Sequence, residues 1–349
     1  MKIFVHECIT AGGLGEGPVP ATLLAEGRMM LQALLADLLA LQEHRLVVQV
    51  DRRYLPQLRP HPGLQIVDSR DGYHHTFRQK VVEADATFLT APETDGRLEA
   101  ITAIVERCGK LVVGSGTAGV KVAGNKMLTH RWLEEHGIST PETIHLRPVD
   151  DPLSIDRRLS YPVVAKPIDG GGCDGVFIAQ RPSELERTAA TARQTTPGKD
   201  LLLQHYIDGV HASVSLLTDG SRSVPLTLNH QEIRGRSRLT YYGGCVPFEH
   251  PLRTLAFHRA AEVVQAIPGL KGYVGIDLVL TDDDAVVIEV NPRLTTSYVG
   301  LRKVLRQNLA ALMLDAAAGK LPDPADIDII GSAHFTTRDG TITVSEGVR

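Results

Sequence analysis

Short apolar runs alternate with longer amphipathic stretches through the first 115 residues. Alternating strand and helix patterns predict a parallel sheet with helices on both faces, which is a doubly wound α/β domain. We assign this domain to residues 1–115. Its predicted strands are 3–6, 46–50, 64–67, 86–90 and 111–113, and its predicted helices are 21–41 and 97–107.

From residue 116 onwards, strand-like runs follow one another with fewer helical stretches between them, which predicts α+β units. We divide this part into residues 116–205 and 206–349. The predicted strands are 161–167, 176–179, 201–203, 212–217, 226–233, 275–280, 285–291, 333–337 and 341–344, the last two joined by a turn at 339–340. The predicted helices are 125–137, 255–266 and 298–318, and 241–244 is expected to be a loop.

Two of these strands enclose the polar turn 281–284 and carry a constellation of oxygen-bearing side chains. Alternate residues of a strand share a face, so Glu289 and Asn291 point the same way, and Asp277 on the partner strand can face the same space. Such oxygens suit Mg²⁺ beside substrate phosphates, and Arg293 adds a fixed cation for a phosphoryl group. The alternative is a half-exposed hairpin whose acids are solvated.

A buried-looking strand ends at Lys166 and runs directly into the consecutive glycines Gly170, Gly171 and Gly172. Glycines allow main-chain N–H groups to approach phosphate oxygens, and the lysine adds a positive charge. A plain hairpin turn, which is the alternative, does not require three glycines. The segment therefore predicts a phosphate-binding loop, although the chain has no G-x-x-x-x-G-K-[ST] motif.

Residues 114–119 match G-x-G-x-x-G after a predicted strand, which taken alone suggests a dinucleotide site. However, this match closes the first α/β unit, and the acids about 20 positions on, Glu134 and Glu135, fall inside a predicted helix. We interpret the segment as an interdomain turn, which disfavours a dinucleotide-dependent oxidoreductase. Asn125 suits the N-cap of that helix, and Lys126 then stands at its first position, where the helix dipole mildly disfavours a lysine.

Two further groups are candidates for substrate contacts. Ligands of parallel sheets bind beyond the carboxyl ends of the strands, so we expect a substrate edge at Glu7, Thr10, Gly12 and Gly13. A flexible loop that binds no ligand is the alternative. Arg234, Arg236 and Arg238 follow the predicted strand 226–233 at alternate positions and share a face if that strand continues. That face suits an acidic substrate, and a solvated basic edge is the alternative.

Composition limits the classes of partner. With 37 Lys and Arg against 41 Asp and Glu, the net charge of −4 gives no indication of nucleic-acid or membrane binding. The start of the chain becomes polar too soon for a signal peptide. Cysteines 8, 108, 173 and 245 have no metal-binding spacing and favour a reducing compartment. We therefore expect a cytoplasmic protein that binds neither nucleic acid nor a membrane.

Taken in order along the chain, the motifs between about residues 114 and 320 resemble those of the ATP-grasp superfamily. The matching residues are Lys126, Lys166 with its triple glycine, 204–207, Asp277 and Glu289-x-Asn291. The resemblance implies a pre-ATP-grasp domain followed by a two-lobed ATP-grasp module that holds ATP and two Mg²⁺ or Mn²⁺ ions, and it implies a homodimer. Its implied ligands are Lys126, Lys166 and the glycine loop for phosphates, Gln204, His205, Tyr206 and Ile207 for adenine, and Asp277, Glu289 and Asn291 for the metals.

This sequence departs from the superfamily pattern at two positions of the adenosine site. His211 stands where related ligases often have a glutamate that binds the ribose hydroxyls, so Asp208 is the alternative ribose ligand. Gln204 replaces a glutamate at the hinge. These differences concern recognition of adenosine and leave the reaction class unchanged.

Three stretches, 6–14, 228–233 and 291–298, resemble the tyramine–glutamate ligase family of methanofuran biosynthesis. The resemblance implies that ATP activates a carboxylate as an acyl phosphate, which an amine then attacks. The implied product is a γ-glutamyl amide of tyramine, or of tyrosine in a related furan cofactor. Lys166 and Arg293 would stabilise the transferring phosphoryl group and the oxyanion. The alternatives are another amino-acid or dipeptide ligase of the superfamily, or a nucleotide-binding regulator without turnover.

Overall fold

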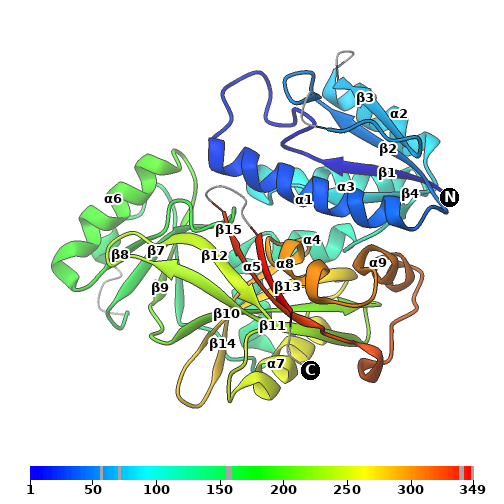
Figure 1. The fold of residues 1–349 in the computed structure, drawn as a ribbon. Coiled ribbons are helices and arrows are strands. Elements are labelled where there is room, and N and C mark those ends of the chain that lie inside the picture. Colours follow the sequence, from blue (N-terminus) through cyan, green and yellow to red (C-terminus); the bar gives the residue numbers. More distant parts are fainter. Residues whose placement is uncertain (56–57, 70–71, 155–158, 338–341, 347–349) are drawn as a thin grey trace.

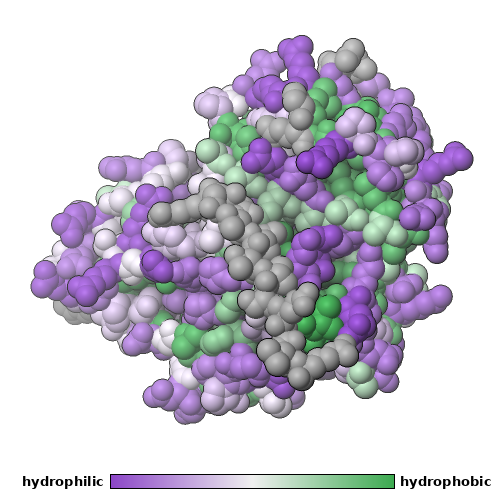
Figure 2. Space-filling model, viewed as in Figure 1, coloured by the Kyte–Doolittle hydropathy of each residue, from purple (hydrophilic) through white to green (hydrophobic). Residues whose placement is uncertain are grey.

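The structure is a computed structural model that describes residues 1–55, 58–69, 72–154, 159–337 and 342–346. The turn predicted at 339–340 lies outside the described residues. Within them, no helix has the length and apolar character needed to cross a bilayer. Figure 2 shows a mostly hydrophilic face on which hydrophobic residues form separate patches.

A five-stranded parallel sheet forms the N-terminal domain. Its strands lie in the order β3 (Leu64–Asp68), β2 (Arg45–Val50), β1 (Lys2–Glu7), β4 (Ala86–Thr90) and β5 (Leu111–Val112). Val5 and Val48 pack against α1 (Ala21–Ala40), whereas Phe4 and Val47 face the core under α2 (Tyr73–Glu83) and α3 (Arg97–Arg107). Alternate strand residues therefore bury opposite faces, and the predicted doubly wound arrangement is confirmed.

A four-stranded antiparallel sheet follows. Its order is β6 (Thr143–Leu146), β9 (Leu201–His205), β7 (Val163–Pro167) and β8 (Phe177–Ala179). The helix α6 (Leu185–Thr195) covers one face, where Val163 and Ala165 are buried. Val164 and Lys166 alternate with them along β7, so these two side chains point to the opposite face.

A seven-stranded sheet forms the C-terminal lobe. Its order is β14 (Ala285–Asn291), β13 (Gly272–Leu280), β10 (Val210–Thr218), β11 (Ser223–Arg234), β12 (Thr240–Val246), β15 (Gly331–Thr336) and β16 (Ile342–Glu346). The apolar side of α7 (Arg253–Ala266) packs on one face, whereas α8 (Ser297–Val304) and α9 (Leu309–Ala317) join the core that contains α1. The predicted hairpin of β13 and β14 is confirmed.

The helix α1 connects the N-terminal domain to this lobe, because it lies between the parallel sheet and α8 with α9 (Figure 1). Asp37 is buried in the contact. Its carboxylate accepts hydrogen bonds from the Tyr298 hydroxyl at 2.6 Å and from Nε of Arg302 at 2.8 Å. Its main-chain carbonyl accepts one from the Asn308 side chain at 2.8 Å. The pairing satisfies a buried carboxylate and fixes the helix against the lobe.

Two sequence-based element assignments are wrong. The expected helix 298–318 is two helices, because Leu305 leaves the helical conformation and the Asn308 side chain caps α9 by accepting from the Ala311 N–H. The expected loop 241–244 is part of β12. A Cβ on Gly243 would lie 2.0 Å from the Phe335 carbonyl oxygen, so this glycine allows close strand packing instead of a turn.

The segment 114–119 forms the start of α4 (Thr117–Ala123), and α5 (Lys126–Glu135) follows it. The Gly116 N–H donates to the Gly269 carbonyl at 2.9 Å, and Gly119 packs directly on the Gly269 backbone. The glycines therefore serve a close contact between segments. We propose domain boundaries near 115/116 and 205/206, since each falls between two of the sheets.

We expect Gly119→Ala to lower the free energy of unfolding by about 1–3 kcal/mol, because overpacking forces the backbone to move. The new Cβ would lie 2.5 Å from the Gly269 carbonyl carbon. Chemical denaturation measures the change. The matched control is Gly17→Ala, since no atom lies within 4 Å of a Cβ there. Equal stabilities of the two variants would show that the Gly119 contact does not require a glycine.

Candidate functional site

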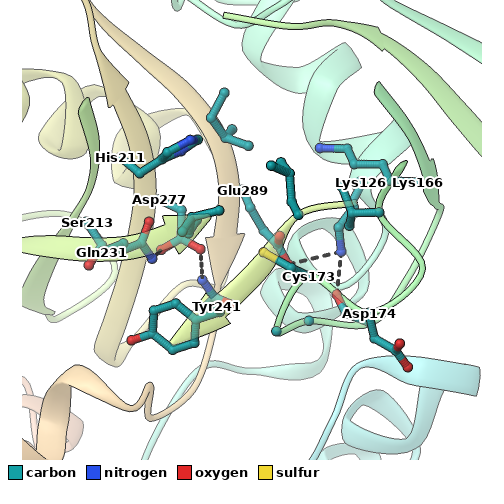
Figure 3. A pocket seen from close by; sticks show the side chains of 18 of the residues that line it. Lys126, Lys166, Cys173, Asp174, His211, Ser213, Gln231, Tyr241, Asp277 and Glu289 are labelled. Carbon is teal, nitrogen blue, oxygen red and sulfur yellow. Dashed lines mark hydrogen bonds and ion pairs between the residues drawn. The ribbon is translucent and has the colours of Figure 1, made fainter. Parts of the chain in front are cut away.

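A cleft, seen from close by in Figure 3, lies between the four-stranded and seven-stranded sheets. Glu26 and Met30 of α1 also line it. The structure brings together there most of the residues predicted for phosphate, adenine and metal binding. These are Lys126, Lys166, Gly170, Gly171, Gly172, Gln204, His205, Tyr206, Ile207, His211, Asp277, Glu289, Asn291 and Arg293. The predicted residues that do not line the cleft are Glu7, Thr10, Gly12, Gly13, Asp208, Arg234, Arg236 and Arg238.

Lys126 reaches the cleft from the first turn of α5. The predicted cap is confirmed, because the Asn125 side chain accepts hydrogen bonds from the N–H groups of Met127 and Leu128, each at 3.0 Å. The Lys126 ammonium pairs with the Glu289 carboxylate at 3.0 Å and donates to the Gly170 carbonyl, as the dashed lines in Figure 3 show. One amine thus joins the metal candidates to the glycine loop.

The register of β13 and β14 places Asp277 directly opposite Glu289. Asp277 accepts hydrogen bonds from Gln231 at 2.9 Å and from the Asn291 amide nitrogen at 3.2 Å. Burial raises the pKa of Asp277 to about 7, and repulsion from Glu289 acts in the same direction. Two carboxylates that repel each other in a buried place are stabilised by a cation.

The donor set fits a hard divalent ion. Among the described residues, no three His, Cys, Asp or Glu side chains cluster as metal ligands, and the candidate set here is two carboxylates with an amide. The Asn291 amide nitrogen donates a hydrogen bond to Asp277, which leaves the Asn291 amide oxygen available as a metal ligand. Mg²⁺ is commonly held by one or two carboxylates together with substrate phosphates, so a larger cage is not required.

Lys166 projects into the cleft from β7 and has almost no exposed surface. Burial lowers the pKa of its ammonium group to about 8; Glu289 opposes this shift and Lys126 reinforces it. A buried ammonium without its full complement of partners favours an incoming anion. The position therefore suits a phosphoryl group.

The glycine loop is held in backbone conformations that favour glycine. Gly170 and Gly172 have φ values of 94° and 70°, and Cys173 follows at 61°. A Cβ on Gly171 would lie 3.3 Å from Nη2 of Arg293, so the loop lies directly against that guanidinium. The loop thus covers the same space into which Lys126, Lys166 and Arg293 extend.

The segment 204–207 lies where β9 ends at the cleft. Gln204 is a strand residue whose amide donates to the Thr143 hydroxyl at 2.8 Å. His211 lines the cleft, and burial lowers its pKa, which favours the neutral imidazole. Asp208 is exposed and lies outside the cleft lining, so the structure offers His211 and not Asp208 to a ligand there.

Arg293 is anchored by a residue that sequence reasoning missed. Glu93, in the loop after β4, binds the guanidinium through two contacts, Nε to Oε1 at 2.7 Å and Nη2 to Oε2 at 2.9 Å. Only 5% of the Glu93 side chain is exposed. The two residues are 200 positions apart, so no local pattern in the sequence could indicate the pair. The N-terminal domain thereby positions a cation of the cleft.

Glu93→Gln is expected to destabilise the fold by about 3 kcal/mol, because removing one partner of a buried pair leaves the other charge uncompensated. Activity should also fall, since Arg293 loses its fixed orientation. Chemical denaturation and steady-state kinetics measure the two effects, with the exposed Glu135→Gln as control. A variant with normal stability and normal turnover would contradict the positioning role of Glu93.

The predicted substrate edge after β1 is a satisfied buried turn. The Glu7 carboxylate accepts hydrogen bonds from the Ile9 N–H at 3.0 Å and from the N–H and hydroxyl of Thr10, each at 2.7 Å. A Cβ on Gly13 would lie 2.3 Å from the Cys8 sulfur, and Gly12 has a φ of 88°. These residues shape the loop and are not presented to the cleft.

The three arginines do not share a strand face, because β11 ends at Arg234. Gly235 then turns the chain so closely that a Cβ there would lie 1.8 Å from the Arg238 carbonyl oxygen. Arg234 pairs with Glu232 and lies over the Tyr242 ring, whereas Arg238 lies over Phe177. The expectation of a continuous basic edge is therefore wrong.

Comparisons with known proteins agree with this arrangement. Residues 123–297 match the model of the ATP-grasp domain, and residues 44–120 match a pre ATP-grasp domain. A tyramine–L-glutamate ligase of Methanocaldococcus fervens is 29% identical over 321 residues, which are 91% of this chain and 94% of that protein.

Two solved structures share the fold. An ATP-grasp superfamily protein from Archaeoglobus fulgidus has a TM-score of 0.72 at 22% identity, with both chains fully covered. A D-alanine–D-alanine ligase from Bacillus anthracis in complex with ATP has a TM-score of 0.67 at 18% identity, covering 91% of this chain and 98% of the other. The ATP-grasp model alone matches just over half of the 349 residues. The chain therefore belongs to the ATP-grasp family.

Proposed function

We propose that this ATP-grasp ligase joins the γ-carboxylate of L-glutamate to the amine of tyramine or tyrosine, in the biosynthesis of a furan cofactor such as methanofuran. One observation supports the reaction class above all others. A single cleft gathers two lysines, a glycine loop, two carboxylates and an anchored arginine, although they come from three parts of the chain. The choice of substrates rests on the tyramine–L-glutamate ligase relative, which matches over nearly its whole length.

The chemistry requires activation because a carboxylate has no good leaving group. In the proposed reaction, a carboxylate oxygen attacks the γ-phosphorus of ATP, and ADP leaves. The amine then attacks the carbonyl carbon of the acyl phosphate. A carbon–nitrogen bond forms, the amine loses a proton, and phosphate leaves with the former carboxylate oxygen.

Residues of this chain have defined parts in that proposal. Lys126 and Lys166 hold the phosphates, and the glycine loop excludes water from them. Arg293, oriented by Glu93, stabilises the negative charge that develops on the carbonyl oxygen. Asp277, Glu289 and Asn291 would hold the divalent ions, which neutralise phosphate charge when bound.

The test is incubation of the purified protein with ATP, Mg²⁺ or Mn²⁺, L-glutamate, and tyramine or tyrosine, followed by product mass measurement. We expect ADP, phosphate and a glutamyl amide in equal amounts, with fragmentation that places the amide on the γ-carboxylate. ATP binding without any acceptor-dependent hydrolysis would instead indicate a nucleotide-binding regulator.

A second candidate is an amino-acid or dipeptide ligase, which the fold shared with a D-alanine–D-alanine ligase supports. The two candidates differ in the nucleophile, since a dipeptide ligase uses the amino group of a second amino acid. Phosphate release from glutamate with a panel of amines, set against release from pairs of amino acids, separates them. Turnover confined to amino-acid pairs would favour the second candidate.

A further inference from the structure

Glu26 is a charged side chain of the cleft to which the proposed function gives no role. It lies on α1 and lines the cleft together with Met30, about one helical turn further along. Several Lys, Arg, Asp and Glu side chains are among the described residues that line the cleft. Among them, Glu26 and Lys166 alone make no hydrogen bond or ion pair with the rest of the described chain. The phosphates account for Lys166, so Glu26 remains without a partner.

The position of Glu26 is fixed by the packing of its neighbour. A Cβ on Gly27 would lie 2.9 Å from the Glu7 carboxylate, so the glycine lets α1 approach the end of β1 closely. Glu7 itself is buried, accepts hydrogen bonds from Ile9 and Thr10, and does not line the cleft. Glu7 is therefore used by the loop after β1, whereas Glu26 on the adjacent helical position is presented to the cleft.

The surroundings of Glu26 leave its charge uncompensated. Arg293 lies within its electrostatic reach, but that guanidinium already forms a two-point pair with Glu93. The Tyr241 hydroxyl, also within reach, is bonded to the Thr296 hydroxyl at 2.9 Å. Burial raises the pKa of Glu26, and Arg293 opposes the shift. A carboxylate so placed is stabilised by a cationic group on the ligand.

We propose that Glu26 binds the α-ammonium group of the amino acid whose distal carboxylate is phosphorylated. The inference rests on the proposed function and deepens it, because it assigns the acid substrate to the space between α1, Tyr241 and Arg293. Glu26 is then a residue that determines specificity, and it takes no part in the covalent steps.

The acid substrate fits this position better than the amine acceptor does. An α-ammonium group stays charged throughout the reaction, so a fixed carboxylate can hold it from binding to release. The acceptor must attack as a neutral amine. A buried carboxylate beside it would favour its protonated, unreactive form. Glu26 is therefore better suited to bind the α-ammonium group of the acid substrate, which keeps its positive charge.

The test compares L-glutamate with glutarate, which has the same two carboxylates but no amino group. In the wild-type enzyme, we expect the kcat/KM of acid-dependent ADP release to be much higher with glutamate. Glu26→Gln should raise the KM for glutamate by between about 10-fold and 100-fold, the range for a lost charge-assisted hydrogen bond. The KM values for glutarate and for the amine should change little. Thermal melting checks that the isosteric variant is folded.

The control is Glu43→Gln, which removes an exposed carboxylate just beyond α1 and should leave all constants unchanged. If Glu26→Gln keeps the wild-type preference for glutamate over glutarate, the inference is wrong. A selective rise in the KM for the amine would also overturn it and would assign Glu26 to the acceptor. No acid-dependent turnover by the wild-type enzyme, with glutamate or any other amino acid, would refute the proposed function itself, and with it the premise of this inference.

Discussion

Replacing Glu289 by alanine is expected to lower kcat for ADP formation by about 1000-fold, which corresponds to about 4 kcal/mol of transition-state stabilisation. Glu289 is one of the two carboxylates opposite each other on β13 and β14, and it also pairs with Lys126 at 3.0 Å. Its removal takes away a proposed metal ligand and releases a lysine proposed to hold phosphate. The measurement is ADP release at saturating ATP over a range of Mg²⁺ concentrations.

The matched control for Glu289→Ala is Asp282→Ala, an exposed acid in the turn of the same hairpin. It should leave kcat and the Mg²⁺ dependence unchanged. Near-normal turnover of the Glu289 variant, with the Mg²⁺ dependence of the wild type, would show that the metal assignment is incorrect.

Lys166→Met should separate activity from stability. We expect kcat to fall by about 100-fold to 1000-fold, as for the loss of one preorganised charge at a reacting group. Stability should stay constant or rise, because a buried ammonium carries a desolvation cost that a methionine of similar length avoids. The lowered pKa of Lys166, caused chiefly by burial, is consistent with that cost.

Kinetics and thermal melting of the same preparation measure both effects of Lys166→Met, with the exposed Lys320→Met as control. A variant that loses activity only because it unfolds would show that Lys166 has a structural role. Full activity would exclude Lys166 from the phosphate site.

Local sequence patterns were sufficient to predict the parts of the site in which the functional side chains alternate along a strand. Asp277, Glu289 and Asn291 were placed on one hairpin face from their spacing, and the observed register brings all three to the cleft. The strand that ends at Lys166 and the cap at Asn125 were likewise readable from a few consecutive residues. Such features are determined by residues close in sequence, so they can be predicted without knowledge of the tertiary structure.

Contacts between distant segments could not be predicted in this way. Glu93 and Arg293 meet only because the N-terminal domain packs against the C-terminal lobe. Glu26 reaches the cleft because Gly27 lets α1 approach β1, a contact that no spacing encodes. Sequence patterns therefore do not indicate the side chains that the N-terminal domain contributes to the cleft, and they favour residues of the loop after β1 instead.

Glycine caused two further errors, because this residue type serves several structural purposes. The glycines of 241–244 suggested a loop, but Gly243 allows two strands to approach closely. Gly235 ends β11 and thereby separates the three arginines.

The helix α2 was not predicted, because its sequence combines two histidines and a threonine with few apolar positions. Such a sequence gives a weak periodic signal.

Transfer of oxygen from the carboxylate to phosphate tests the central proposal most directly. With glutamate labelled by ¹⁸O in its side-chain carboxylate, we predict that each molecule of inorganic phosphate released during amide formation carries one labelled oxygen. That result requires a bond between the carboxylate and the γ-phosphorus of an ATP held in the cleft. Release of unlabelled phosphate, or of AMP carrying the label, would contradict it.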